Sequence, residues 1–93
     1  MSLITVGLPV YNADAFIRDA IQSILNQTFK DFHLLIIDDG STDNSIATIK
    51  TFNDPRIELV IEDQNLGLPY RLNQIAKMSN SKYLARMDAD DIM

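Results

Sequence analysis

Two aspartates separated by one alanine, Asp88 and Asp90, stand near the end of this 93-residue sequence, directly after an apolar segment. In a loop, two carboxylates at this spacing can turn toward one site, and hard cations such as Mg²⁺ prefer carboxylate oxygens. A metal held there and bridging a diphosphate would neutralise that group as it leaves. The spacing also fits a solvated acidic turn, because Asp-x-Asp is short and common. Asp88 and Asp90 are therefore a candidate metal site.

A second acidic pair, Asp38-Asp39, closes another apolar run and is followed by Gly40. A carboxylate just past a strand can reach over the edge of a sheet and accept hydrogen bonds from a base N–H or from ribose hydroxyls. The alternative is a turn in which the residues from Gly40 to Asp43 merely cap a helix. Both can hold, because Gly40 and the cap can be structural while Asp39 binds a ligand.

Three further residues can take part in such a site, each with a structural alternative. Tyr11 could pack its ring against a base while Asn12 fixes the loop, or the two could be a core-edge ring and a helix cap. Arg71, early in a helical segment, could contact a phosphate or a base, or it could be a solvated helix residue. Asn65 and Gly67 are typical of a turn, and His33 has no partner motif.

The elements that must position these residues alternate along the chain. Apolar runs predict strands over residues 3–8, 33–37, 57–61 and 82–87, the first of them closed by Pro9. Helical periodicity separates them. The first helix begins after Asn12 or Asp14 as a cap, the second after the cap at 41–43, and the third at Pro69.

The expected buried positions follow from the same periodicity. In the first helix they are Phe16, Ile17, Ala20, Ile21, Ile24 and Leu25, and in the third they are Leu72, Ile75 and Ala76.

The βαβαβαβ alternation, with helices of about three turns, predicts an α/β fold. We expect an open, mostly parallel, Rossmann-like sheet with flanking helices and strand order 3-2-1-4. In such sheets ligands bind at the carboxyl ends of the strands. Segments 9–12, 38–41 and 88–91 follow three different strands, so they should share one rim despite their distance in sequence.

Composition narrows the function classes. With 46% hydrophobic and 23% charged residues the chain is typical of a globular protein, and with no cysteine it has no disulfide framework or thiolate site. A net charge of −5 argues against nucleic acid as a partner. No apolar run reaches the roughly 18–20 residues of a transmembrane segment, and no signal peptide is recognisable. We expect a cytoplasmic protein, with the full-length protein at the cytoplasmic face of a membrane.

Taken in order, the motifs resemble those of family 2 glycosyltransferases, which adopt the GT-A fold. The resemblance covers nearly the whole chain and rests on five segments: residues 6–12, 23–29, 37–43, 65–67 and 87–91. It implies an enzyme that transfers a sugar, with inversion, from a nucleotide-diphosphate sugar, usually UDP-linked, to an acceptor hydroxyl. The acceptor, a saccharide or a lipid-linked molecule, cannot be named from these segments.

The resemblance also implies residue roles. Pro9, Tyr11 and Asn12 line the nucleotide pocket, Asp39 binds the base, and Arg71 lies in a region that contacts the nucleotide. Asp88 contacts the ribose or the metal shell, and Asp90 coordinates Mg²⁺ or Mn²⁺. The family's general base lies well beyond the Asp-x-Asp segment, so no catalytic residue is assigned here. Residues 1–93 are expected to be the donor-binding portion of a domain truncated at its C-terminus, and inactive alone.

Three other readings compete with this one. A receiver-like phosphoacceptor domain carries its acidic pair after the first strand, whereas Asp38-Asp39 follows the second. A dinucleotide-binding oxidoreductase needs a G-x-G-x-x-G loop after the first strand, and residues 9–14 contain no glycine. A non-catalytic nucleotide-binding or oligomerisation module that keeps the fold stays open as an alternative.

Overall fold

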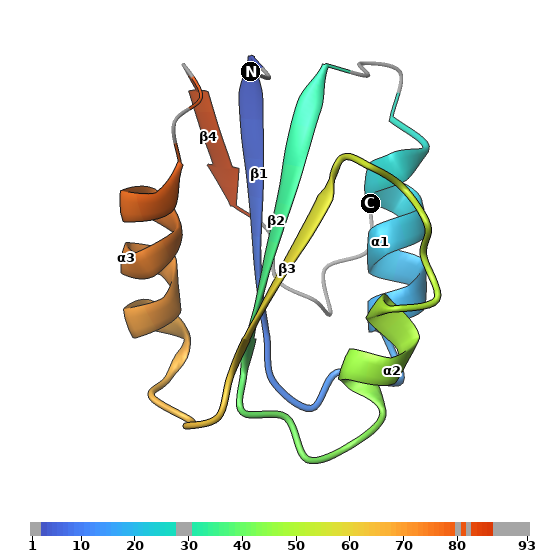
Figure 1. The fold of residues 1–93 in the computed structure, drawn as a ribbon, viewed down its shortest axis with the longest axis vertical. Helices are drawn as coiled ribbons and strands as arrows, with labels where there is room; N and C mark the ends of the chain where they lie inside the picture. The colour runs from blue at the N-terminus through green and yellow to red at the C-terminus, as the bar shows by residue number, and fades with distance from the viewer. Residues whose placement is uncertain (1–2, 28–30, 80, 82, 87–93) are drawn as a thin grey trace.

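The chain folds into a four-stranded sheet with helices on both faces (Figure 1). The computed structural model describes residues 3–27, 31–79, 81 and 83–86. The elements follow in the order β1 (Ile4–Val10), α1 (Ile17–Leu25), β2 (Phe32–Asp39), α2 (Ser45–Ile49), β3 (Ile57–Glu62), α3 (Leu68–Met78) and β4 (Tyr83–Arg86). The predicted alternation of strands and helices is confirmed.

All described strand pairs are parallel, and the order is β3-β2-β1-β4. This confirms the α/β class and the order 3-2-1-4. Helices α1 and α2 lie on one face and α3 on the other, as Figure 1 shows. Because β1 lies between β2 and β4, its residues face neighbours on both sides, which fits its buried, largely apolar sequence.

The first strand does not stop at Pro9 as the sequence predicts. Pro9 stays in register with Ile37, and Val10 with Asp38. Proline ends a strand where its missing N–H is needed for the ladder, but its fixed φ is compatible with extended backbone. The described pairing with β4 reaches only Gly7, so no pairing on that side is described opposite Pro9.

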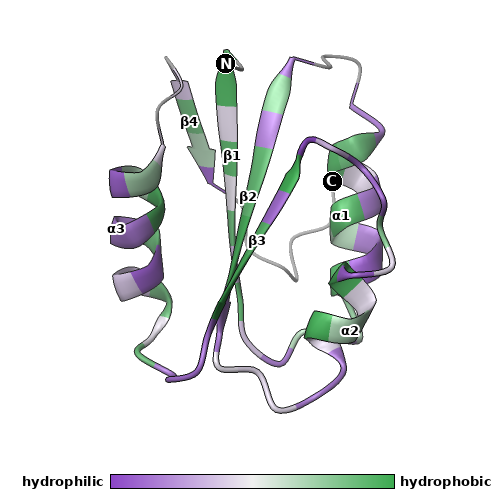
Figure 2. Cartoon of the chain, viewed as in Figure 1, coloured by the Kyte–Doolittle hydropathy of each residue, from purple (hydrophilic) through white to green (hydrophobic). Residues whose placement is uncertain are grey.

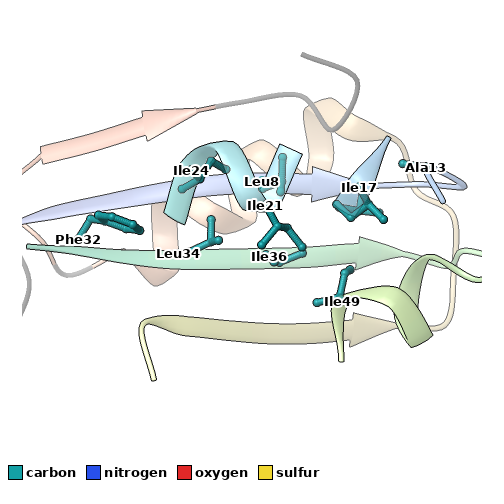
Figure 3. Packing of buried hydrophobic residues seen from close by; sticks show 10 residues of the cluster. Leu8, Ala13, Ile17, Ile21, Ile24, Phe32, Leu34, Ile36 and Ile49 are labelled. Carbon is teal, nitrogen blue, oxygen red and sulfur yellow. The ribbon is translucent and has the colours of Figure 1, made fainter. Parts of the chain in front are cut away.

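The larger core lies between the sheet and helices α1 and α2 (Figure 3). Ile17, Ala20, Ile21 and Ile24 of α1 are buried at four positions spaced for one face. Phe16 does not belong to that face. It is 46% exposed and precedes the helix, so the expected buried position there is wrong. The buried cluster consists of Leu8, Val10, Ala13, Ile17, Ile21, Ile24, Phe32, Leu34, Ile36 and Ile49.

Helix α3 covers the other face with a smaller core. Leu35, Ile37 and Ile75 form it, and Figure 2 shows the apolar residues of α3 on the side toward the sheet. The expected buried Ala76 is exposed, and Arg71 is buried in α3 beside Ile75 instead. Residues 71 and 75 lie one turn apart on one face of the helix. The face toward the sheet therefore includes the charged Arg71 and leaves out Ala76, which the apolar periodicity alone had placed on it.

The helix starts also differ from the sequence prediction. Neither Asn12 nor Asp14 caps α1, which follows a turn in which the N–H groups of Phe16 and Ile17 donate to the carbonyl of Ala13. Helix α2 has five residues rather than three turns. Asp43 does satisfy its first amide, since Oδ1 accepts the Ser45 N–H at 2.9 Å. Pro69 stands in the first turn of α3, as predicted.

Gly7 allows α3 to approach β1. A Cβ at residue 7 would lie 2.5 Å from Cγ2 of Ile75, a stiff β-branched side chain with no exposed surface. A methyl group there must push α3 away from the sheet or distort Ile75.

We therefore expect Gly7→Ala to lower the free energy of unfolding by about 1–3 kcal/mol, the usual cost of overpacking a core. Urea unfolding measures this. The double variant Gly7→Ala/Ile75→Ala should cost less than the sum of the two single variants, because the second change removes the methyl that clashes. A Gly7→Ala chain as stable as the parent would mean that the helix approaches less closely.

Candidate functional site

The carboxyl ends of β1, β2 and β3 lie side by side at one end of the sheet, hereafter the carboxyl edge or simply the edge. Val10 is in register with Asp38, and Asp39 with Glu62, so the loops that follow these strands begin side by side. These loops carry most of the described candidate residues. The convergence predicted from the strand order is therefore present for the first two strands.

The carboxylate of Asp39, at the end of β2, is buried and accepts three hydrogen bonds. The Asp39 side chain is 1% exposed. Oδ1 accepts the N–H of Leu66 at 3.0 Å and Nε–H of Arg71 at 2.6 Å, while Oδ2 accepts the N–H of Gly67 at 3.0 Å. One carboxylate at the end of β2 thus fixes both the turn before α3 and the first turn of α3 itself.

Arg71 is buried as the partner of Asp39, with 3% of its side chain exposed. Besides the bond to Asp39, Nη1 donates to Oε1 of Gln74 at 2.9 Å, and Nη2 donates to the carbonyl of Gln64 at 2.7 Å. The guanidinium also lies 5.2 Å from the ring centroid of Tyr70. The solvated arginine offered as an alternative by the sequence is wrong, and Arg71 lies with Asp39 in one charged pair.

The electrostatics of the pair favour the ionised carboxylate. Burial alone would raise the pKa of Asp39. The hydrogen bonds from the Leu66 N–H, from Arg71 and from the Gly67 N–H, together with the positive charge of Arg71, outweigh burial and hold the pKa of Asp39 below the ordinary 3.8. Asp39 is therefore a charged acceptor at neutral pH.

The loop after β1 is held by side chains of the loop after β2 and of the first residue of α2. The N–H of Asn12 donates to Oγ of Ser41 at 2.9 Å, that of Ala13 to Oγ of Ser45 at 2.8 Å, and that of Asp14 to Oδ2 of Asp43 at 3.2 Å. In return, Oδ1 of Asn12 accepts the N–H of Thr42 at 2.7 Å.

Asn12 itself has a φ of 48°, a left-handed conformation that asparagine tolerates better than most residues. It fixes the loop, as the sequence suggested, rather than capping α1. Tyr11 precedes it with 43% of its surface exposed, so its ring is available on the loop that Asn12 holds. Pro9 is buried below the rim.

Asp38 and Gly40 are structural parts of the same edge. The carboxylate of Asp38 has no exposed surface and accepts both the N–H and the hydroxyl of Ser41. Gly40 has a φ of 77°, and a Cβ there would lie 3.0 Å from the backbone of Gln64 and 3.1 Å from that of Asn65. Gly40 therefore lets the loop after β2 contact the turn before α3.

The remaining predicted residues, Asp88 and Asp90, lie outside the described residues. Within residues 3–27, 31–79, 81 and 83–86, no cluster of three or more His, Cys, Asp or Glu side chains is arranged to hold a metal. Glu62, Gln64 and Gln74 complete the surroundings of Arg71 and are not predicted by any sequence motif. The only signal for Glu62 was an acid at the end of the third apolar run.

The fold and this edge define an open, parallel α/β protein whose polar loops gather at the carboxyl ends of the strands. The chain belongs to glycosyl transferase family 2, whose family model matches residues 5–93. An uncharacterized glycosyltransferase of Haemophilus influenzae is 39% identical over 97% of this chain and 28% of its own length. The Escherichia coli protein WfgD, a UDP-Glc:alpha-D-GlcNAc-diphosphoundecaprenol beta-1,3-glucosyltransferase, is 34% identical over 97% of this chain and 36% of its own length.

Solved structures agree on the fold. Staphylococcus aureus TarS 1-349 in complex with UDP-GlcNAc matches with a TM-score of 0.89 and 25% identity over 99% of this chain and 27% of its own. A mannosyltransferase of Pyrobaculum calidifontis, in complex with GDP-Man and Mn²⁺, has a TM-score of 0.89 at 23% identity over 98% and 28%. The chain thus spans about a third or less of most of these proteins. Among its described helices, none is long and apolar enough to cross a membrane.

The lowered pKa of Asp39 predicts acid sensitivity of the fold. Its folded pKa lies below the unfolded value of 3.8, so its stabilisation is present above that value and is lost as the pH falls through the folded pKa. Urea midpoints measured from pH 5 to pH 2.5 should fall, and in Asp39→Asn the fall should be shallower. The exposed Asp63→Asn is the control and should follow the parent. An equal slope in Asp39→Asn would show that other carboxylates dominate.

Proposed function

We propose that this chain is the donor-binding part of a glycosyltransferase that moves a sugar from a UDP-linked donor to an acceptor hydroxyl. The observation that carries the proposal is the buried Asp39–Arg71 pair at the carboxyl edge of the sheet, beside the loop that presents Tyr11. Family membership and the UDP-sugar named for two of the relatives above support it.

The pair is complementary to a uracil base. In the described part of the chain, Oδ2 of Asp39 accepts a single hydrogen bond, and three of the five N–H groups of Arg71 have partners. An ionised carboxylate accepts the N3–H of uracil, and an arginine N–H donates to a ring carbonyl. Cytosine presents an acceptor at N3 and would oppose the carboxylate. We therefore assign Asp39 and Arg71 to the base and Tyr11 to its ring face.

The base cannot reach Asp39 without some movement of the turn before α3. Leu66 and Gly67 donate to the carboxylate and leave it 1% exposed. Binding should therefore displace Leu66 and Gly67, which their amide resonances would report. The turn would then be a part of the pocket that adjusts to the donor.

A diphosphate donor also needs its negative charge neutralised, and a divalent metal can do this. In dinucleotide-binding folds, backbone N–H groups after the first strand hold the pyrophosphate. Here the N–H groups of Asn12, Ala13 and Asp14 already donate to side chains of the next loop and of Ser45 at the start of α2. Charge neutralisation must come from elsewhere, and we assign it to Mg²⁺ or Mn²⁺ held by Asp90 with help from Asp88.

The donor chemistry of these two residues suits such an ion, because hard cations prefer carboxylate oxygens and complete their shell with water and phosphate. A solved neighbour supports this. Glucosyl-3-phosphoglycerate synthase of Mycobacterium tuberculosis, in complex with Mn²⁺, UDP and phosphoglyceric acid, has a TM-score of 0.76 at 25% identity over 98% of this chain and 34% of its own. When bound, the metal would stabilise the departing diphosphate.

For the reaction as a whole we propose inversion at the anomeric carbon. The acceptor hydroxyl then attacks opposite the diphosphate and loses its proton to a base. No residue of this chain is assigned that role. The acceptor is a saccharide or a lipid-linked saccharide, and the cytoplasmic face of a membrane is the proposed location. The diphosphoundecaprenol acceptor named for WfgD supports this choice.

Base recognition is tested with ligands rather than with a destabilising variant. We expect UDP to bind more tightly than CDP, and N3-methyl-UDP to lose about 1–3 kcal/mol, the cost of an unmade hydrogen bond to a buried group. Calorimetric titration of the parent protein measures all three. Equal affinities for UDP and N3-methyl-UDP would show that the base does not bind Asp39. No affinity for any of the three would contradict donor binding.

Metal binding is tested by coupling. Two carboxylates make an incomplete coordination shell, so metal and nucleotide should bind cooperatively. The metal should raise the affinity for nucleotide by the same factor as the nucleotide raises the affinity for metal. Mn²⁺ should strengthen UDP binding in the parent and much less in Asp90→Asn, which removes a charge at nearly constant shape. Asp63→Asn, an exposed acid in the loop after β3, is the matched control and should keep the full effect. An undiminished Mn²⁺ effect in Asp90→Asn would place the metal elsewhere.

A further inference from the structure

Gln74 joins Arg71 to a second acidic residue. It lies three positions after Arg71 on α3, on the same side of the helix. Its Oε1 accepts Nη1–H of Arg71 at 2.9 Å, and its Nε2 donates to Oε2 of Glu62 at 2.7 Å. Turning the amide over would set donor against donor at Arg71 and acceptor against acceptor at Glu62, so the two partners fix its orientation.

Glu62 stands on β3 where Asp39 stands on β2. Each is the last residue of its strand, and the two are in register. The Glu62 carboxylate is 4.0 Å from Nη1 of Arg71, too far for a hydrogen bond, and its side chain is 34% exposed. Gln74 therefore carries the contact between them. Helix α3 thus contacts the ends of two neighbouring strands. Arg71 binds Asp39 of β2, and Gln74 binds Glu62 of β3.

The guanidinium is consequently held at all three nitrogens. Asp39 holds Nε, the Gln64 carbonyl holds Nη2, and Gln74 holds Nη1. A single bond at Nε would leave the guanidinium plane free to tilt. Charge balance does not require Glu62, because Asp39 already supplies one negative charge. The described contacts of Gln74 and Glu62 thus act on the orientation of Arg71.

We propose that Gln74 and Glu62 are positioning residues that aim the remaining N–H groups of Arg71 at the nucleotide base and so set the preference for uracil. The proposal rests on the donor-binding function above. Gln74 bonds both Arg71 and Glu62, and the two residues act through Arg71, so their effect should appear in selectivity more than in the stability of the fold.

The experiment compares Gln74→Leu and Glu62→Ala with the conservative variant Glu62→Gln and with Glu58→Ala. Residue 58 is the matched control, since Glu58 is also an acid on β3, but it pairs with His33 at 2.9 Å. We expect Gln74→Leu and Glu62→Ala to weaken UDP binding about fivefold, the loss of one hydrogen bond, and to lower the UDP-to-CDP affinity ratio. Glu62→Gln keeps an acceptor for Gln74 and should stay near the parent, as should Glu58→Ala.

A second measurement needs no nucleotide. The Nε–H resonance of Arg71 should be protected from solvent exchange in the parent and in Glu58→Ala, and should exchange faster in Gln74→Leu. An unchanged resonance together with an unchanged UDP-to-CDP ratio would overturn the proposal. If the parent does not bind UDP at all, the donor-binding function fails, and with it the role in selectivity. The resonance then still decides whether Gln74 holds Arg71.

Discussion

The buried carboxylate of Asp39 needs an opposite charge and hydrogen-bond donors. The residues that supply them join α3 and the turn before it to the end of β2. Ionised groups are costly to remove from water unless charge and hydrogen bonds compensate for the loss. Here Arg71 supplies the opposite charge, and the amides of Leu66 and Gly67 supply two further bonds. Removing either charged partner would leave the other buried alone, which typically destabilises a protein by about 3–5 kcal/mol. The Asp39–Arg71 pair itself joins α3 to the end of β2.

The other two loops of the edge are held by the same kind of contact, in which side chains satisfy backbone amides across loops. The side chains of Ser41, Asp43 and Ser45 accept hydrogen bonds from backbone N–H groups of the loop after β1. The side chain of Asn12 accepts one from the loop after β2. Gly40 brings the second loop against the third. These contacts fix the loops after β1 and β2 against each other before a ligand arrives, which reduces the entropy lost on binding, and the turn before α3 is the part that has to move.

The sequence predicts the strands and their order well because each strand is an apolar run and parallel crossovers have one hand. It predicts less well where a residue's environment comes from a distant segment. Arg71 could not be recognised as buried, since its partners Asp39 and Gln64 lie 32 and 7 positions away. Asn12 and Asp14 look like helix caps locally, yet their partners belong to the next loop. Pro9 was expected to end a strand, whereas extended backbone in register with Ile37 accommodates it.

The central place of β1 in the sheet has a consequence for synthesis on the ribosome. Among the described strands, β1 leaves the ribosome before the others, but its partner on one side, β4, follows last. At elongation rates of about 5–20 residues per second, the interval between the two is roughly 4–15 seconds. During that time the β4-facing edge of an apolar strand has no partner from its own sheet, and parallel pairing over such separations is slow. The nascent protein should therefore depend on chaperones that shield extended apolar segments, and codons that shorten this interval should improve its yield.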